Sequence, residues 1–108
     1  MEQEIVQSEW ENFLKSFGRK HKSWLVTVSR NQDEIIKNEP LNDLRMTEEG
    51  VSIAVGKEII LIDALLSVRL IKTQAGADQS IDFVSDDGTT TITINRPTLP
   101  EMVDGILI

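Results

Sequence analysis

The sequence predicts an α+β fold in which an N-terminal amphipathic helix packs on a mainly antiparallel sheet of about six strands. An apolar stripe of helical period lies near the N-terminus, and alternating, β-branched segments follow from about residue 23 to residue 95. No repeat or linker divides the 108 residues, of which 40% are hydrophobic. Because that supply suffices for one core, we expect a single domain over residues 1–108 whose sheet could partly close into a barrel.

The helix is predicted over residues 8–17. Its apolar stripe has the spacing i, i+3, i+4 and i+7 and consists of Trp10, Phe13, Leu14 and Phe17. Ser8 followed three residues later by Glu11 predicts a capping box, in which each side chain accepts a hydrogen bond from the other residue's amide. Gly18 is expected to end the helix, because glycine adopts the left-handed conformation after a helix without strain.

The first half of the sheet is predicted from a change of period. From Ser23 to Ser29 the apolar residues alternate with a period of two, which indicates a strand, and residues 31–33 indicate a turn. A short second strand at residues 35–36 is expected to stop before Pro40, because proline cannot donate a hydrogen bond to a strand ladder.

The second half is predicted to contain the remaining strands, at residues 51–55, 59–62, 65–73, 80–84 and 89–94. Asp63-Ala64 predicts a bend between two of them, and Asp86-Asp87-Gly88 predicts a tight hairpin turn. Residues 98–105 predict a short C-terminal helical turn, with proline near its start and glycine at its end.

Two blocks of the sequence carry a resemblance to other proteins. The first runs from Trp10 to Leu14, with Phe17 and His21, into residues 24–28; the second comprises residues 68–70, 76–78, 87–90 and 99–105. On these blocks, which cover about half of the chain, the sequence resembles a family of small bacterial proteins catalogued only as a domain of unknown function, number five-three-three-five. The most specific part is the string Leu-Pro-Glu-Met-Val-Asp-Gly. The resemblance implies a compact single domain and no particular activity.

Composition excludes several kinds of functional site. The absence of cysteine rules out a disulfide scaffold, a thiolate zinc site, an iron–sulfur cluster and a cysteine nucleophile. The sequence also lacks a phosphate-binding glycine loop, a Gly-x-Ser-x-Gly elbow and a calcium loop of the helix-loop-helix type. We therefore expect no metal and no cofactor.

Charge and hydropathy indicate which partners and which cellular location to expect. A net charge of -7 makes nucleic acid an unfavourable partner. The longest apolar run, Ile59 to Ile71, is interrupted by polar residues and is shorter than the roughly 20 residues that a membrane span needs. No secretory signal is recognisable at the N-terminus, so a cytoplasmic protein that does not contact membranes is expected.

The basic residues around the only histidine suggest two candidate features. His21 lies beside Lys20 and Lys22, whose charges would disfavour its protonation. We interpret it as a surface connector, with a catalytic base as the alternative. The basic cluster could bind an anionic ligand or an acidic segment of a partner, but the favoured interpretation is that it complements the helix dipole; it consists of Lys15, Arg19, Lys20 and Lys22.

Acidic side chains provide the remaining candidates. Groupings that offer oxygen ligands to a cation occur at residues 48–49, at Asp82 with residues 86–87, and at Glu101 with Asp104. We interpret residues 48–49 and residues 86–87 as turn residues rather than as ligands. Glu101 and Asp104 would share a face of the C-terminal turn, where Arg96 could pair with either.

The leading hypothesis is a small non-enzymatic binding or interaction domain that binds to itself or to another protein. The apolar surplus of Ile59 to Ile71 exceeds what one small sheet face needs, which favours a homodimer. The alternative is a small-ligand carrier or hydrolase with a pocket between the helix and the sheet. Its candidate binding residues are His21, Trp24, Arg96, Glu101 and Asp104, and no catalytic residue is assigned.

Overall fold

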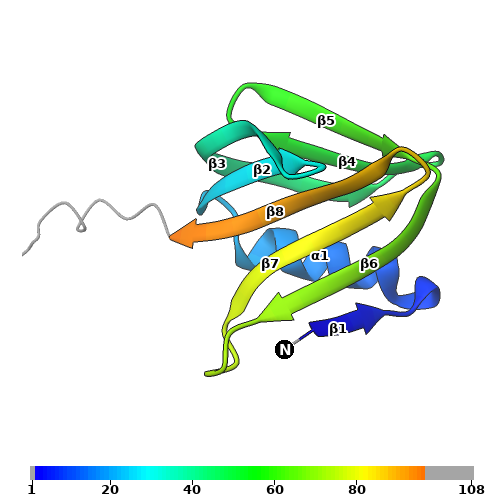
Figure 1. Cartoon of the computed structure of the whole chain (residues 1–108), viewed down its shortest axis with the longest axis horizontal. Helices are drawn as coiled ribbons and strands as arrows, with labels where there is room; N and C mark the ends of the chain where they lie inside the picture. The colour runs from blue at the N-terminus through cyan, green and yellow to red at the C-terminus, as the bar shows by residue number, and fades with distance from the viewer. Residues whose placement is uncertain (1, 97–108) are drawn as a thin grey trace, which may run out of the picture.

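The computed structural model describes residues 2–96, so the turn predicted at residues 98–105 lies outside the described part of the chain. The N-terminal helical segment consists of a 3-10 turn, η1 (Gln7–Glu9), and a helix, α1 (Trp10–Lys20). The strands are β1 (Glu2–Ile5), β2 (Leu25–Arg30), β3 (Asp33–Met46), β4 (Gly50–Val55), β5 (Glu58–Asp63), β6 (Leu65–Lys72), β7 (Asp78–Ser85) and β8 (Gly88–Arg96). Figure 1 shows a strongly curved sheet with α1 behind β6 and β7.

The strands form one antiparallel sheet in the order β1-β6-β7-β8-β2-β3-β4-β5. The expected α+β class, with an N-terminal helix on an antiparallel sheet, is confirmed. The expected number of strands is wrong, because the sheet has eight strands rather than six. The sheet also does not close into a barrel, since β1 and β5 remain its two edges.

β1 is a strand that was not predicted. Three of its four residues are exposed and polar, so its sequence shows no buried alternation. The strand is held by distant contacts instead: it pairs with β6, and Nη1 of Arg69 donates to Oε2 of Glu2 at 3.2 Å. At its other end, Nε1 of Trp10 donates to the carbonyl of Ile5 at 2.9 Å in the core.

The helix differs from the prediction at both ends. Glu9, not Ser8, occupies the N-cap position of α1, and no side chain caps the helix there. The helix continues through Gly18 to Lys20, and His21 caps it through its backbone N–H to Phe17. Gly18 has another role: a Cβ at this position would lie 3.2 Å from Cβ of Leu44 on β3. The glycine therefore lets helix and strand approach each other closely rather than ending the helix.

β3 continues through Pro40, where an interruption was predicted. The first part of β3 pairs with β2 and the later part, from Leu41, pairs with β4. Pro40 lies where the strand changes partner, and its carbonyl accepts a hydrogen bond from the N–H of Gly56. Just before it, Asn38 has a φ of 57° in an irregular stretch of the β2–β3 ladder. The proline is tolerated because it lies at a junction between two ladders.

Most predicted turns are confirmed. Asn31 and Gln32, with φ values of 51° and 75°, connect β2 to β3. Ala64, with a φ of 54°, separates β5 from β6 at the predicted bend. Asp86-Asp87 connects β7 to β8, and Gly88 follows with a φ of 132°. L side chains rarely adopt this φ, and a Cβ on Gly88 would also displace the end of the Asn31 side chain, so this position favours glycine.

The core combines one face of α1 with one face of the sheet. Trp10, Leu14 and Phe17 are buried as the helical stripe predicts, and Phe13 is partly buried against them. Val26 and Val28 of β2 are fully buried, which confirms the alternation predicted for that strand. α1 packs mainly against β3, and this contact leaves a groove along its edge.

Candidate functional site

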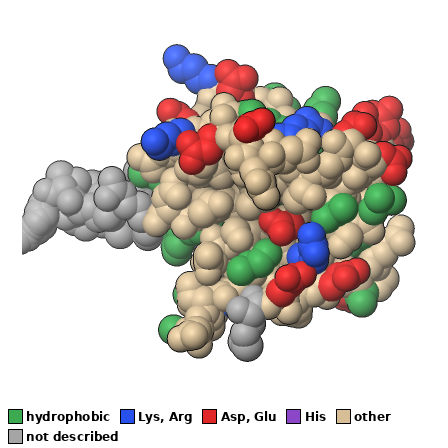
Figure 2. All heavy atoms as spheres, viewed as in Figure 1, with side chains coloured by type: hydrophobic (Ala, Val, Ile, Leu, Met, Phe, Trp, Pro, Cys, Tyr) green, Lys and Arg blue, Asp and Glu red, His purple; other side chains and the backbone are tan. Residues whose placement is uncertain are grey.

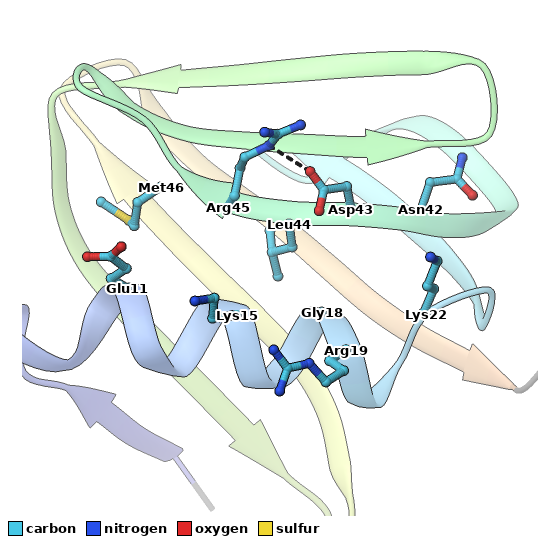
Figure 3. Close-up of a pocket in the computed structure, with 10 residues that line it drawn as sticks. All are labelled: Glu11, Lys15, Gly18, Arg19, Lys22, Asn42, Asp43, Leu44, Arg45 and Met46. Atoms are coloured by element: carbon cyan, nitrogen blue, oxygen red, sulfur yellow. Dashed lines mark ion pairs between the residues drawn. The ribbon is translucent and has the colours of Figure 1, made fainter.

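A groove of about 730 Å³ lies between α1 and β3, and we call it the α1–β3 groove. Its lining residues are Glu11, Lys15, Gly18, Arg19 and Lys22 on the helical side, and Asn42, Asp43, Leu44, Arg45 and Met46 on the strand side. Figure 3 shows that helix and strand run in opposite directions, with Met46 above Glu11 and Asn42 above Lys22. The helical wall extends for about 17 Å at 1.5 Å per residue.

The helical wall carries a stripe of cations. Lys15, Arg19 and Lys22 are spaced i, i+4 and i+7, which places them along one side of the helix and its extension. All three are exposed, and none makes an ion pair with any residue from 2 to 96. Arg19 lies in the last turn, where it complements the helix dipole. Lys15 lies in the middle of α1, so the dipole does not account for it.

The strand wall is nearly neutral and supplies the floor. Nε of Arg45 lies 2.7 Å from Oδ2 of Asp43, and this ion pair joins two residues of the same strand. Leu44 is buried against Gly18, whose missing side chain brings the strand close to the helix. The unbalanced charge of the α1–β3 groove therefore comes from the helical stripe.

His21 lies in the interior, so its interpretation as a surface connector is wrong. Its side chain is 1% exposed and packs between two aromatic rings, 4.2 Å from the ring centre of Phe17 and 4.7 Å from that of Trp24. Nδ1 lies 2.9 Å from the carbonyl oxygen of Phe17. Because a carbonyl oxygen only accepts, Nδ1 carries a proton and donates it. Nε2 lies 3.5 Å from Oδ2 of Asp78.

Burial lowers the pKa of His21 below its usual 6.5. The hydrogen bond to Phe17 and the charge of Asp78 oppose this effect, whereas Lys20 adds to it. The expected direction is thus correct, but desolvation rather than the neighbouring cations is the main cause. A buried ring whose nitrogens face Phe17 and Asp78 has the features of a structural histidine.

Of the five candidate binding residues, the structure describes the side chains of two, His21 and Trp24. His21 and Trp24 are in contact with each other, and neither lines the groove. The backbone of Arg96 pairs with Leu25 at the end of β8, but its side chain lies outside the described part. Glu101 and Asp104 also lie outside the described residues.

The acidic groupings within residues 2–96 have structural positions. Asp82 accepts a hydrogen bond from Oγ1 of Thr91 at 2.7 Å, and residues 86–87 form the β7–β8 turn. Over the described residues, no group of three His, Cys, Asp or Glu side chains is placed to hold a metal ion. No helix in the same range is long and apolar enough to cross a membrane.

The cations of the groove are recognisable in the sequence, but its strand wall is not. The two-residue alternation of β3 is broken by a register shift between Leu41 and Asp43, so the exposed and buried positions do not follow a simple pattern. A usable signal was present in Gly18, because a glycine inside a helical pattern often marks a close approach of another element. Asn42 and Met46 carry no comparable signal.

Comparisons with protein-family models, with curated proteins and with solved structures found no match. The resemblance to the family of unknown function stays a prediction.

Proposed function

We propose that this protein is a non-enzymatic interaction domain that binds an acidic segment of a partner protein in the α1–β3 groove. The observation that carries the proposal is the stripe of Lys15, Arg19 and Lys22, which faces the groove without ion pairs to residues 2–96. The chain as a whole has a net charge of -7. A local concentration of positive charge on such a surface would direct an acidic partner to this one place.

The shape of the groove favours an extended segment as the occupant. At about 3.3 Å per residue, a wall of about 17 Å accommodates about five residues of extended chain. The partly buried side chain of Met46 and the floor at Leu44 offer apolar contact beside the cations. An acidic peptide with an apolar side chain would match both features.

A hydrolase or small-ligand carrier built on His21 has less support. His21 lies outside the groove, and its ring is enclosed by Phe17, Trp24 and Asp78. A general base must come within hydrogen-bond reach of a substrate proton. The described surroundings of His21 leave no place for a substrate at that distance.

The test uses a fluorescein-labelled hexaglutamate peptide and measures its fluorescence anisotropy with the full chain at low salt. We expect saturable binding that weakens as salt is added, because the attraction is between exposed charges. The variant K15E/K22E should weaken binding by at least about tenfold. The control variant R30E/K37E makes the same change of charge on β2 and β3 outside the groove, and it should bind like the wild type.

Two results would overturn this assignment. Equal weakening in K15E/K22E and R30E/K37E would mean that the peptide responds only to net charge. Inorganic phosphate that perturbs the amide resonances of the groove at a lower concentration than the peptide does would identify a small-anion site instead.

A further inference from the structure

β5 is an edge of the sheet whose outer side is unpaired. Within residues 2–96, the backbone of residues 57–63 makes no hydrogen bond to another backbone group outside the strand ladders. The strand exposes Ile59 and Leu61, which are 69% and 63% accessible. In Figure 2, hydrophobic side chains reach the surface along the upper margin, where β5 runs, next to both acidic and basic side chains. A bare, apolar edge strand is a template for another strand.

We infer that β5 pairs antiparallel with β5 of a second copy of this chain, about a two-fold axis at Ile60. This inference concerns a different surface from the α1–β3 groove and does not depend on the function proposed for that groove. Of the apolar segment Ile59 to Ile71, only β5 would form the interface, and it would pair in a single register.

The direction of the backbone groups restricts the possible registers. The N–H of Gly56 donates to Pro40 on β3, so the preceding residue, Val55, directs its backbone groups to β5, where it is paired with Glu58. Backbone groups alternate along a strand, and the β4–β5 ladder has no register shift. Ile59 and Leu61 therefore direct their N–H and C=O groups to the free edge. For both residues to form hydrogen bonds with residues 57–63 of a second copy, the two-fold axis must lie at Ile59, Ile60 or Leu61.

The side chains select one of these three axes. An axis at Ile59 would place Leu61 opposite Lys57 of the second copy, and an axis at Leu61 would place Ile59 opposite Asp63. Both arrangements pair an apolar side chain with a charge. An axis at Ile60 instead places Ile59 opposite Leu61 of the second copy. By symmetry this apolar contact occurs twice, once on each side of the axis.

The same axis also pairs opposite charges. It places Lys57, in the turn before β5, opposite Asp63 of the second copy at the end of the strand. Both side chains are exposed, and neither makes an ion pair within residues 2–96. Two copies that each carry a charge of -7 repel each other, so these attractive pairs offset part of the repulsion at the interface. Charge complementarity thus identifies a second copy of this chain as the occupant of the edge.

The first experiment measures self-association by sedimentation equilibrium from about 1 µM to about 1 mM protein, the range in which a small interface dissociates. We expect a monomer–dimer equilibrium. L61K should raise the dissociation constant at least about tenfold. L66K is the matched control, because Leu66 is similarly exposed, at 60%, but lies on β6; it should associate like the wild type.

A charge exchange tests the register. K57D and D63K should each weaken the dimer, because each places like charges opposite each other, and K57D/D63K should restore it. The proposal would be overturned if the wild type were a monomer at every concentration, or if L66K weakened self-association as much as L61K does. It would also be overturned if K57D/D63K did not restore the dimer. K15E/K22E should leave self-association unchanged, so a failure here is distinguishable from a failure of the groove proposal.

Discussion

Asp78 at the start of β7 receives two contacts from the end of α1. Its Oδ2 lies 3.5 Å from Nε2 of His21 and 3.1 Å from Nζ of Lys20. His21 is buried, whereas the side chain of Lys20 is 65% exposed. Because the buried histidine donates its Nδ1 proton to Phe17, its neutral form presents an acceptor nitrogen to the carboxylate. Only a protonated ring could donate to Asp78, and burial opposes that protonation.

This arrangement predicts loss of stability in mild acid. The pKa of His21 is lower in the folded protein than its usual value of 6.5. The unfolded state therefore binds more protons below that pH, and the stability present above pH 6.5 is lost as pH falls toward the folded pKa. The loss from this group is at most about 1.4 kcal/mol for each pH unit. Urea unfolding measured from about pH 8 to about pH 5 should show it.

The control for this pH dependence is H21N, which retains a side-chain donor but does not titrate. The variant should be less stable than the wild type at neutral pH, and the difference should shrink as pH falls. A constant difference across the pH range would contradict the lowered pKa.

Gly18→Val tests the close approach of α1 to β3. A Cβ at this position would lie 3.2 Å from Cβ of Leu44, and valine adds two further methyl groups. We expect a loss of about 1–3 kcal/mol from overpacking, although helix propensity alone favours valine over glycine. Thermal unfolding measures the effect. Ser16→Val, at an exposed position of the same helix, should change the stability little, and an equal loss there would indicate a general effect on the helix.

Trp10→Phe tests the attachment of β1. The substitution keeps an aromatic ring but removes the hydrogen bond from Nε1 to the carbonyl of Ile5. We expect a loss of about 1–3 kcal/mol in the free energy of unfolding, because the carbonyl is left without its buried donor. Hydrogen exchange of the β1 amides should become faster. Unchanged exchange would show that the pairing with β6 alone holds the strand.

Ser8→Ala tests whether Ser8 caps the helix, as the sequence predicts, or does not, as the structure shows. A working N-cap is worth about 1 kcal/mol, but no side chain caps either η1 or α1. We expect a change below about 0.5 kcal/mol, measured by urea unfolding. A loss near the full value of a cap would support the capping box instead.

The elements that local sequence determines were predictable. The helical stripe, the Asp63-Ala64 bend and the β7–β8 turn follow from period and turn chemistry, and each is present. β1 and the continuity of β3 were not predictable in this way, because their positions depend on partners elsewhere in the chain. Glu2 lies opposite Ile71, and Pro40 is accommodated at a change of partner.

The candidate site shows the same division. The cations of α1 were recognised because their spacing on a helix is visible in the sequence, whereas their groove depends on the position of β3. His21 was misplaced because one of the residues that enclose it, Asp78, is distant in the sequence and only the fold brings it near. Aromatic neighbours alone, Phe17 and Trp24, did not reveal it.

The order of the strands has a consequence for folding kinetics. Most neighbouring strands in the sheet are also consecutive in the sequence and form hairpins. The strands β2 to β5 and the strands β6 to β8 can therefore each assemble through local contacts. The two units join through β2 and β8, where Arg30 is paired with Thr90. Closing so long a loop is entropically costly before its contacts form, so this junction should limit the folding rate. During synthesis, β2 can pair with β8 only after nearly all of the described residues have been made.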